Sequence, residues 1–197
     1  AIRNPQSVAL WFLFLIAALA LTCWLGSFVI SQFVATSLIA FGESPQSRAQ
    51  AVAFAPTNPA VLAAQGKYLL YRADEADPAA GISALERAVK SSPFDYRFWL
   101  ELGRGYETDN QPAAAERTYK QAQQLAPRYF ETHWTLANFY LRSGRTEESL
   151  AEFRQALELS GEATGAEVQP TRARAALNAY AAVTQALGLN LAALRQI

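Results

Sequence analysis

The chain has 197 residues, and its 17 acidic residues balance its 17 lysines and arginines. The net charge is therefore zero, whereas nucleic-acid-binding domains typically carry an excess of basic residues. We expect no nucleic-acid partner. The charges are nevertheless unevenly distributed, because no Asp, Glu, Lys, Arg or His occurs from Gln6 to Gly42. The sequence therefore predicts one part that contacts lipid and another that contacts water.

The first predicted element, residues 1–41, is a transmembrane anchor. Its uncharged run, from Val8 to Phe41, reads VALWFLFLIAALALTCWLGSFVISQFVATSLIAF. A helix that crosses a bilayer needs about 20 apolar residues, whereas the apolar region of a cleavable signal peptide has about 7–15. We therefore favour a retained, single-pass anchor surrounded by membrane lipid. A signal peptide and a buried helix of a soluble protein are the alternatives.

Ala18, Thr22 and Gly26 are spaced four residues apart and share one face of this helix. Small residues on one face allow a second transmembrane helix to approach closely, so this face is a candidate docking site for a partner helix. Ordinary composition is the alternative explanation. Arg3 precedes the span, and the positive-inside rule then predicts an external, periplasmic location for the C-terminal part.

Two further features of composition bear on the ends of the chain and on its redox chemistry. The sequence contains no methionine, so we expect that its true start precedes Ala1. The single cysteine, Cys23, has no partner for an intrachain disulfide and is interpreted as a small apolar residue.

Residues 42–58 form a predicted juxtamembrane linker. Pro45, Pro56 and Pro59 discourage a continuous helix through this segment. One short helix is expected within it, from about Arg48 to Phe54.

Residues 59–160 contain an internal repeat with a spacing of 34 residues. The larger matched residues are Leu102 with Leu136, Tyr106 with Tyr140, and Tyr119 with Phe153. The smaller ones are Gly103 with Ala137, Ala115 with Ser149, and Ala122 with Ala156. An upstream copy is degraded, but Leu85, Ala88 and Pro93 match Tyr119, Ala122 and Pro127 at the same spacing.

These offsets resemble the tetratricopeptide repeat, whose pattern W-x2-L-G-x2-Y is followed by Ala, an aromatic residue, Ala and a late Pro. The resemblance implies three units, at about 59–95, 96–129 and 130–160, each made of two antiparallel helices. Small residues such as Gly103 are expected where the two helices of a unit approach most closely. One unit cannot bury its apolar face alone, so the units must stack into an α-solenoid.

Residues 161–197 are expected to form a loop, GEATGAEVQP, followed by a helix with a stripe of Leu177, Tyr180, Thr184 and Leu187. This helix is interpreted as a cap or as a divergent further unit. The predicted fold class is therefore all-α. A single N-terminal transmembrane helix leads into about three tetratricopeptide helical hairpins and a C-terminal capping helix.

The sequence offers little that indicates catalysis. His133 is the only histidine, and it occupies a repeat position where a packed aromatic residue is usual. No Cys/His cluster, haem-attachment motif, nucleophile elbow or phosphate-binding loop is present. We therefore predict no catalytic residue, no metal site and no cofactor, and we expect that the chain is not an enzyme.

The resemblance implies instead a concave face, lined by the first helix of each unit, that binds a protein partner. The family's binding positions carried onto this sequence are Lys67, Tyr71, Arg97, Arg104, Trp134, Asn138 and Arg142. Cationic and amide donors beside flat aromatic rings suit an extended acidic or C-terminal peptide, or a loop of a partner protein. The alternative is a solvated face that contacts nothing.

These features together predict a membrane-anchored scaffold for protein–protein interaction. It would serve as an accessory or assembly subunit of a larger membrane complex in the envelope, in respiration or in photosynthesis. The alternative is a repeat-bearing fragment of a larger membrane enzyme or transporter, such as a glycan ligase or an exopolysaccharide or export protein.

Overall fold

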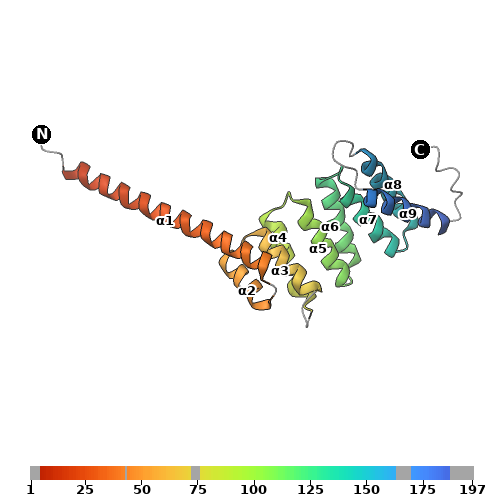
Figure 1. Ribbon diagram of the computed structural model, residues 1–197, viewed down its shortest axis with the longest axis horizontal. Helices are drawn as coiled ribbons and strands as arrows, with labels where there is room; N and C mark the ends of the chain where they lie inside the picture. Colours follow the sequence, from red (N-terminus) through yellow and green to blue (C-terminus); the bar gives the residue numbers. More distant parts are fainter. Residues whose placement is uncertain (1–4, 43, 72–75, 163–169, 187–197) are drawn as a thin grey trace.

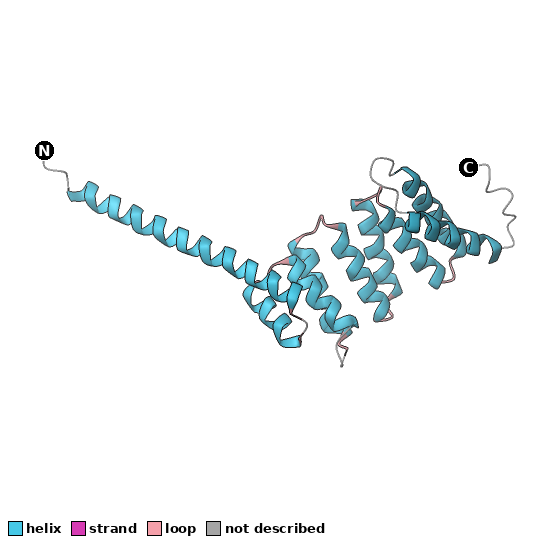
Figure 2. Ribbon diagram, viewed as in Figure 1, coloured by secondary structure: helices cyan, strands magenta, loops and turns pink. Residues whose placement is uncertain are grey.

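A computed structural model describes residues 5–42, 44–71, 76–162 and 170–186 of the chain. Within these residues the secondary structure is entirely helical, without strands, which confirms the all-α prediction (Figures 1 and 2). A long helix leads into a row of shorter helices that stack side by side. The helices are α1 (Pro5–Phe41), α2 (Pro45–Phe54), α3 (Pro59–Tyr71), α4 (Pro78–Ser91), α5 (Tyr96–Thr108), α6 (Pro112–Leu125), α7 (Phe130–Arg142), α8 (Thr146–Glu162) and α9 (Pro170–Ala186).

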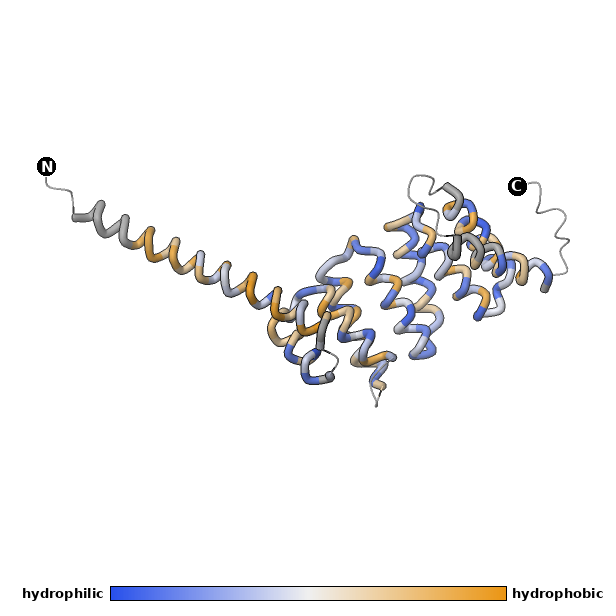
Figure 3. The backbone as a smooth tube through the Cα atoms, in the orientation of Figure 1, coloured by the Kyte–Doolittle hydropathy of each residue, from blue (hydrophilic) through white to orange (hydrophobic). Residues whose placement is uncertain are grey.

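Helix α1 contains the one described stretch, Leu13–Ala40, that is long and apolar enough to cross a membrane. A signal sequence near an N-terminus would pass the same test of length and composition. The most apolar part of this stretch is not buried within the described chain, and Figure 3 shows this helix as largely hydrophobic. The hydroxyls of Thr22 and Ser27 each donate to a backbone carbonyl three residues earlier, so the helix satisfies them internally.

The last turns of α1 pack into the folded body. Ala35 is fully buried against Ala51 of α2, Ala55 just after α2, and Val61 of α3. The end of α1 and α2 therefore form a helical pair on which α3 stacks. This pair crosses the predicted boundary between the anchor (1–41) and the linker (42–58).

Three helical hairpins follow, α3–α4, α5–α6 and α7–α8, and α9 covers the last of them. Their core includes residues that the repeat spacing singled out. Leu85, Leu102, Tyr119, Leu136 and Phe153 are buried there. On α9, Tyr180 and Thr184 are buried, as expected from the predicted stripe. The described part of the chain does not include residues 163–169 and 187–197, among them Leu187 of the predicted stripe. It also leaves out the side chain of Leu177.

The two helices of a hairpin approach most closely at the predicted small residues. A Cβ atom built on Gly103 of α5 would lie 2.4 Å from Cε1 of Tyr119 on α6. In the next unit Ser149 replaces the usual alanine, and its Oγ donates to the carbonyl of Ala137 at 2.9 Å. The departure from the repeat pattern at Ser149 is therefore satisfied by a buried hydrogen bond between α8 and α7.

His133 is a buried structural residue that joins three helices. Its Nε2 lies 2.8 Å from the carbonyl oxygen of Pro127, and its Nδ1 lies 2.7 Å from Oε2 of Glu152 on α8. Gln123 of α6 donates to the same carboxylate oxygen at 2.8 Å. The hydrogen bond to Glu152 raises the pKa of His133, while burial opposes that shift. The protonated imidazole suits this site because it donates to both acceptors.

Replacing Gly103 with alanine tests the close approach of α5 and α6. Overpacking costs about 1–3 kcal/mol, and the better helix propensity of alanine returns up to about 1 kcal/mol. We expect Gly103→Ala to lower the free energy of unfolding by about 1–2 kcal/mol, measured by urea unfolding of the full chain in detergent. Gly105→Ala is the matched control on the same helix, because its Cβ would meet flexible side-chain ends, the first of them 3.2 Å away. An equal loss in both variants would contradict this account.

The His133 site predicts a dependence of stability on pH. The folded-state pKa is raised above the unfolded value of about 6.5, so the stabilisation is fully present below about pH 6.5. It is lost as the pH rises through the folded-state pKa. We therefore expect the difference in unfolding free energy between the native chain and His133→Gln to shrink from pH 6 to pH 9. Glu152→Gln should remove this dependence, and a profile unchanged by Glu152→Gln would refute the assignment.

Candidate partner-binding face

The first helices of the three hairpins, α3, α5 and α7, are linked by ion pairs along one face. Lys67 Nζ of α3 lies 3.1 Å from Oε1 of Glu101 on α5. Arg142 of α7 donates through Nε and Nη2 to the two oxygens of Glu107 on α5, both at 2.9 Å. The paired residues are 34 and 35 positions apart, which is one repeat. We call these contacts the charge ladder.

Arg104 belongs to the same ladder, because its Nη1 donates to Oε1 of Glu101 at 3.1 Å. The structure thus brings three of the predicted cations, Lys67, Arg104 and Arg142, onto one face. It also gives each of them an acidic partner. Sequence reasoning missed Glu101, although a signal was available: opposite charges one repeat apart lie on neighbouring first helices.

The cations of the charge ladder are more exposed than its carboxylates. The side chains of Lys67 and Arg142 are 50% and 57% exposed. Solvent-exposed ion pairs of this kind contribute about 0–1 kcal/mol each. The carboxylates are less exposed, at 16% for Glu101 and 22% for Glu107, and Oε2 of Glu107 also accepts from the hydroxyl of the buried Tyr119 at 2.7 Å.

The other predicted binding residues do not join the ladder. Arg97 pairs with Asp95, the N-cap residue of α5, with Nη2 and Oδ2 2.6 Å apart, and this contact lowers the pKa of Asp95. Asn138 donates its side-chain amide to the backbone carbonyl of Trp134 at 2.7 Å. Arg97 is therefore tied to the beginning of α5, and Asn138 is tied to its own helix.

Trp134 is partly buried within the fold. Its ring stacks on Phe130 with centroids 5.7 Å apart and meets the edge of Phe153 at 5.3 Å. It also packs against the cluster that contains Tyr180 and Val183 of α9. The ring therefore has a packing role between α7, α8 and α9, and its role in partner binding stays a prediction.

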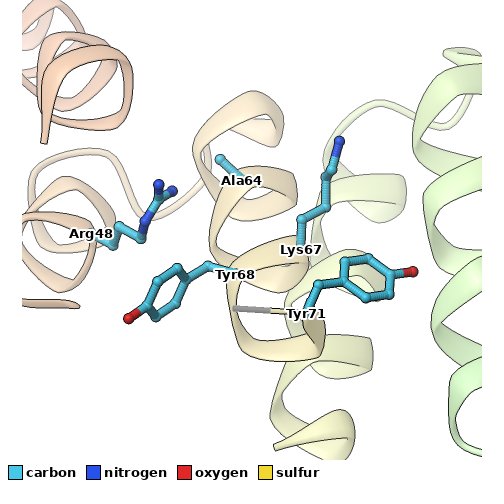
Figure 4. Close-up of a pocket in the computed structure, with 5 residues that line it drawn as sticks. All are labelled: Arg48, Ala64, Lys67, Tyr68 and Tyr71. Atoms are coloured by element: carbon cyan, nitrogen blue, oxygen red, sulfur yellow. The ribbon is translucent and has the colours of Figure 1, made fainter. Parts of the chain in front are cut away.

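A pocket of about 260 Å³ lies at the N-terminal end of this face, and we call it the Arg48 pocket (Figure 4). Arg48 extends from α2, whereas the other lining residues belong to α3. Its guanidinium carbon lies 4.8 Å from the ring centre of Tyr68. Its Nε is buried and has no hydrogen-bond partner among the described residues. The lining residues are Arg48, Ala64, Lys67, Tyr68 and Tyr71.

The Arg48 pocket combines two cations with two phenol rings. Burial raises the pKa of the Tyr71 phenol, so this group stays protonated and can donate a hydrogen bond. Figure 4 shows Arg48 and Tyr68 on one side of α3 and Lys67 and Tyr71 extending toward the other, so each side offers a carboxylate or another anion one cation beside one aromatic ring. Sequence reasoning identified Lys67 and Tyr71 here. It missed Arg48, which lies in the predicted linker, where no repeat position points to it.

Ala18, Thr22 and Gly26 lie within the apolar stretch of α1, Leu13–Ala40. A Cβ built on Gly26 would have no described atom within 4 Å. No described helix packs on this face, and the docking role stays a prediction.

No three His, Cys, Asp or Glu side chains in the described ranges come together in a way that could hold a metal ion. The predictions that the chain holds no metal or cofactor and catalyses no reaction are not tested by this observation.

Comparisons with known proteins agree with the repeat geometry. One tetratricopeptide repeat model matches residues 64–129, and a second matches residues 106–174. No curated protein matches the sequence.

Similar solved structures include the crystal structure of MamA, with a TM-score of 0.57 at 19% identity, covering 68% of this chain and 79% of that chain. MamA 41-end from Desulfovibrio magneticus RS-1 gives a TM-score of 0.59 at 19% identity, with coverages of 68% and 76%. The first TPR of Spaghetti (RPAP3), bound to the HSP90 peptide SRMEEVD, gives 0.51 at 18%, with coverages of 66% and 94%. Identities this low establish a shared fold only. The two family matches run together from residue 64 to residue 174, more than half of the chain, and the protein therefore belongs to the tetratricopeptide repeat family.

Proposed function

We propose that this protein is a membrane-anchored scaffold that binds an acidic segment of a protein partner on the face formed by α3, α5 and α7. The tetratricopeptide repeat is a scaffold for protein–protein interaction, and the solenoid here supports that general role. The observation that carries the finer proposal is the Arg48 pocket, in which a buried Nε has no acceptor among the described residues. The RPAP3 structure, whose bound peptide SRMEEVD is acidic, offers a precedent for the class of ligand.

The charge ladder explains how such a segment would be accepted. Glu101 and Glu107 keep the cations of this face paired while no partner is bound. Carboxylates of a partner would take their place, and Arg48 would gain an acceptor that it otherwise lacks. The exchange conserves ion pairs, so the added affinity comes mainly from the Arg48 pocket and from contact with its tyrosine rings.

Helix α1 supplies the location in this proposal. Its exposed apolar stretch, Leu13–Ala40, is long enough to act as a single-pass anchor, and its small-residue face, Ala18, Thr22 and Gly26, would contact a transmembrane helix of the same complex. The protein would then be an accessory or assembly subunit of that complex, with the solenoid on the external, periplasmic side.

The proposal predicts site-specific crosslinking in the native membrane. Tyr71 is half-exposed at the Arg48 pocket, so a photoreactive residue in its place should form one discrete adduct with a partner protein. The same residue in place of Gln124, which is exposed on the second helix α6, is the control. The adduct should be reduced several-fold by Arg48→Ala. Equal adducts at both positions, or an adduct insensitive to Arg48→Ala, would argue against this face.

The ladder predicts opposite effects of two charge-removing variants. Glu101→Gln releases Lys67 and Arg104 for the partner, so binding of the crosslinked partner segment should become tighter by about twofold to fivefold. Lys67→Gln should weaken binding by a similar factor. Titration of the purified full chain with a synthetic peptide of that segment measures both. Weaker binding after Glu101→Gln would show that the ladder does not compete with the ligand.

A further inference from the structure

Helix α1 leaves the solenoid at a defined edge. Asn58, in the loop between α2 and α3, donates its side-chain amide to Oε1 of Gln32 on α1 at 2.7 Å. Arg87 of α4 donates to the carbonyl of Pro56 in the same loop at 2.9 Å. Because successive helices are antiparallel, the loop between α4 and α5 lies at this same end (Figure 1). We call these two loops, residues 54–58 and 92–95, the inner loop edge.

The length of α1 places this edge at a particular depth. Leu13 to Gln32 is a run of about 20 residues, or about 30 Å of helix, which matches the hydrocarbon core of a bilayer. Gln32 then reaches the headgroup region, and Asn58 is bonded to it. The burial of Ala35 against α2 and α3 holds the solenoid in a set orientation to α1, so the edge cannot swing freely away.

The composition of the inner loop edge suits a lipid surface. Phe94 is 85% exposed, more than any other large apolar side chain among the described residues, and Phe54 is 49% exposed. Lys90 is exposed in the last turn of α4 beside them. The described loop residues at the opposite edge include no large apolar side chain: Ala76 and Asp77 before α4, Asp109, Asn110 and Gln111 after α5, and Ser143, Gly144 and Arg145 after α7.

We infer that the inner loop edge rests on the bilayer surface, with Phe54 and Phe94 among the lipid headgroups and Lys90 near anionic lipid phosphates. Aromatic rings favour this interfacial region, and a basic residue near an anionic surface is attracted to it. The inference rests on the proposed membrane anchor. Because α3 begins at this edge and ends at Tyr71, the Arg48 pocket would be held away from the bilayer and open to a soluble segment of the partner.

The test measures depth with single-cysteine variants of the full chain in vesicles of phosphatidylcholine with phosphatidylglycerol. A fluorophore is attached to the native Cys23, or, in a Cys23→Ser background, to Phe94→Cys or to Ala113→Cys. Ala113 is the control because it is exposed in the first turn of α6 at the opposite edge. Headgroup spin-labelled lipid should quench the label at position 94 at least threefold more than at position 113, and aqueous iodide should show the reverse order.

The outcomes separate this inference from the anchor. Quenching at Cys23 by acyl-chain spin label alone, with equal accessibility at positions 94 and 113, would overturn the inference and leave the anchor intact. Free access of iodide to Cys23 would overturn both. The fluorescence at position 94 could instead depend on the number of protein chains per vesicle and not on the amount of spin-labelled lipid. That result would mean that a second copy of the chain covers the edge, and it would also overturn the inference. Lys90→Gln should reduce headgroup quenching at position 94, and only in vesicles that contain phosphatidylglycerol.

Discussion

The apolar side chains of each hairpin are buried only where the next hairpin covers them, and this stacking constraint organises the whole molecule. It requires a close approach inside each unit, which Gly103 permits against Tyr119. It also requires something to cover the first unit. The end of α1 and α2 provide that cover, so the predicted membrane anchor is also the N-terminal end of the stack.

The same stacking brings side chains one repeat apart into register on the first helices. Opposite charges at that spacing form the charge ladder, and they keep the cations of the face paired at small energetic gain. The Arg48 pocket differs from the ladder, because the buried Nε of Arg48 has no acceptor among the described residues. Within the described part of the chain, most cations of this face are paired with acidic residues of the same chain, and Arg48 is the group left without an acceptor at Nε. Such a face can stay in water without a partner and would still bind an acidic segment in preference to a neutral one.

Helix α1 is continuous with the stack, and this continuity would orient the binding face of the proposed scaffold. A flexible linker would leave the binding face in any orientation, whereas packing of Ala35 and the Gln32–Asn58 hydrogen bond set the angle of the solenoid to α1. In the proposed arrangement, an exposed edge of aromatic and basic residues beside α1 would be a second contact with lipid. The partner would meet a face whose height and orientation above the bilayer are set by the protein itself.

The residue pattern alone determined the repeat. Positions such as Leu102, Tyr119, Ala122 and Phe153 were predictable as core because local spacing decides which side of a helix is covered. The tertiary structure decided what the side chains between those positions do. Trp134, predicted to face a partner, packs on Phe153, and Arg48, assigned to a linker, lines the pocket. Residue spacing specifies which face of a helix is buried. Contacts between distant segments depend instead on how α2 and α9 dock at the two ends of the stack, and no periodic pattern in the sequence encodes that docking.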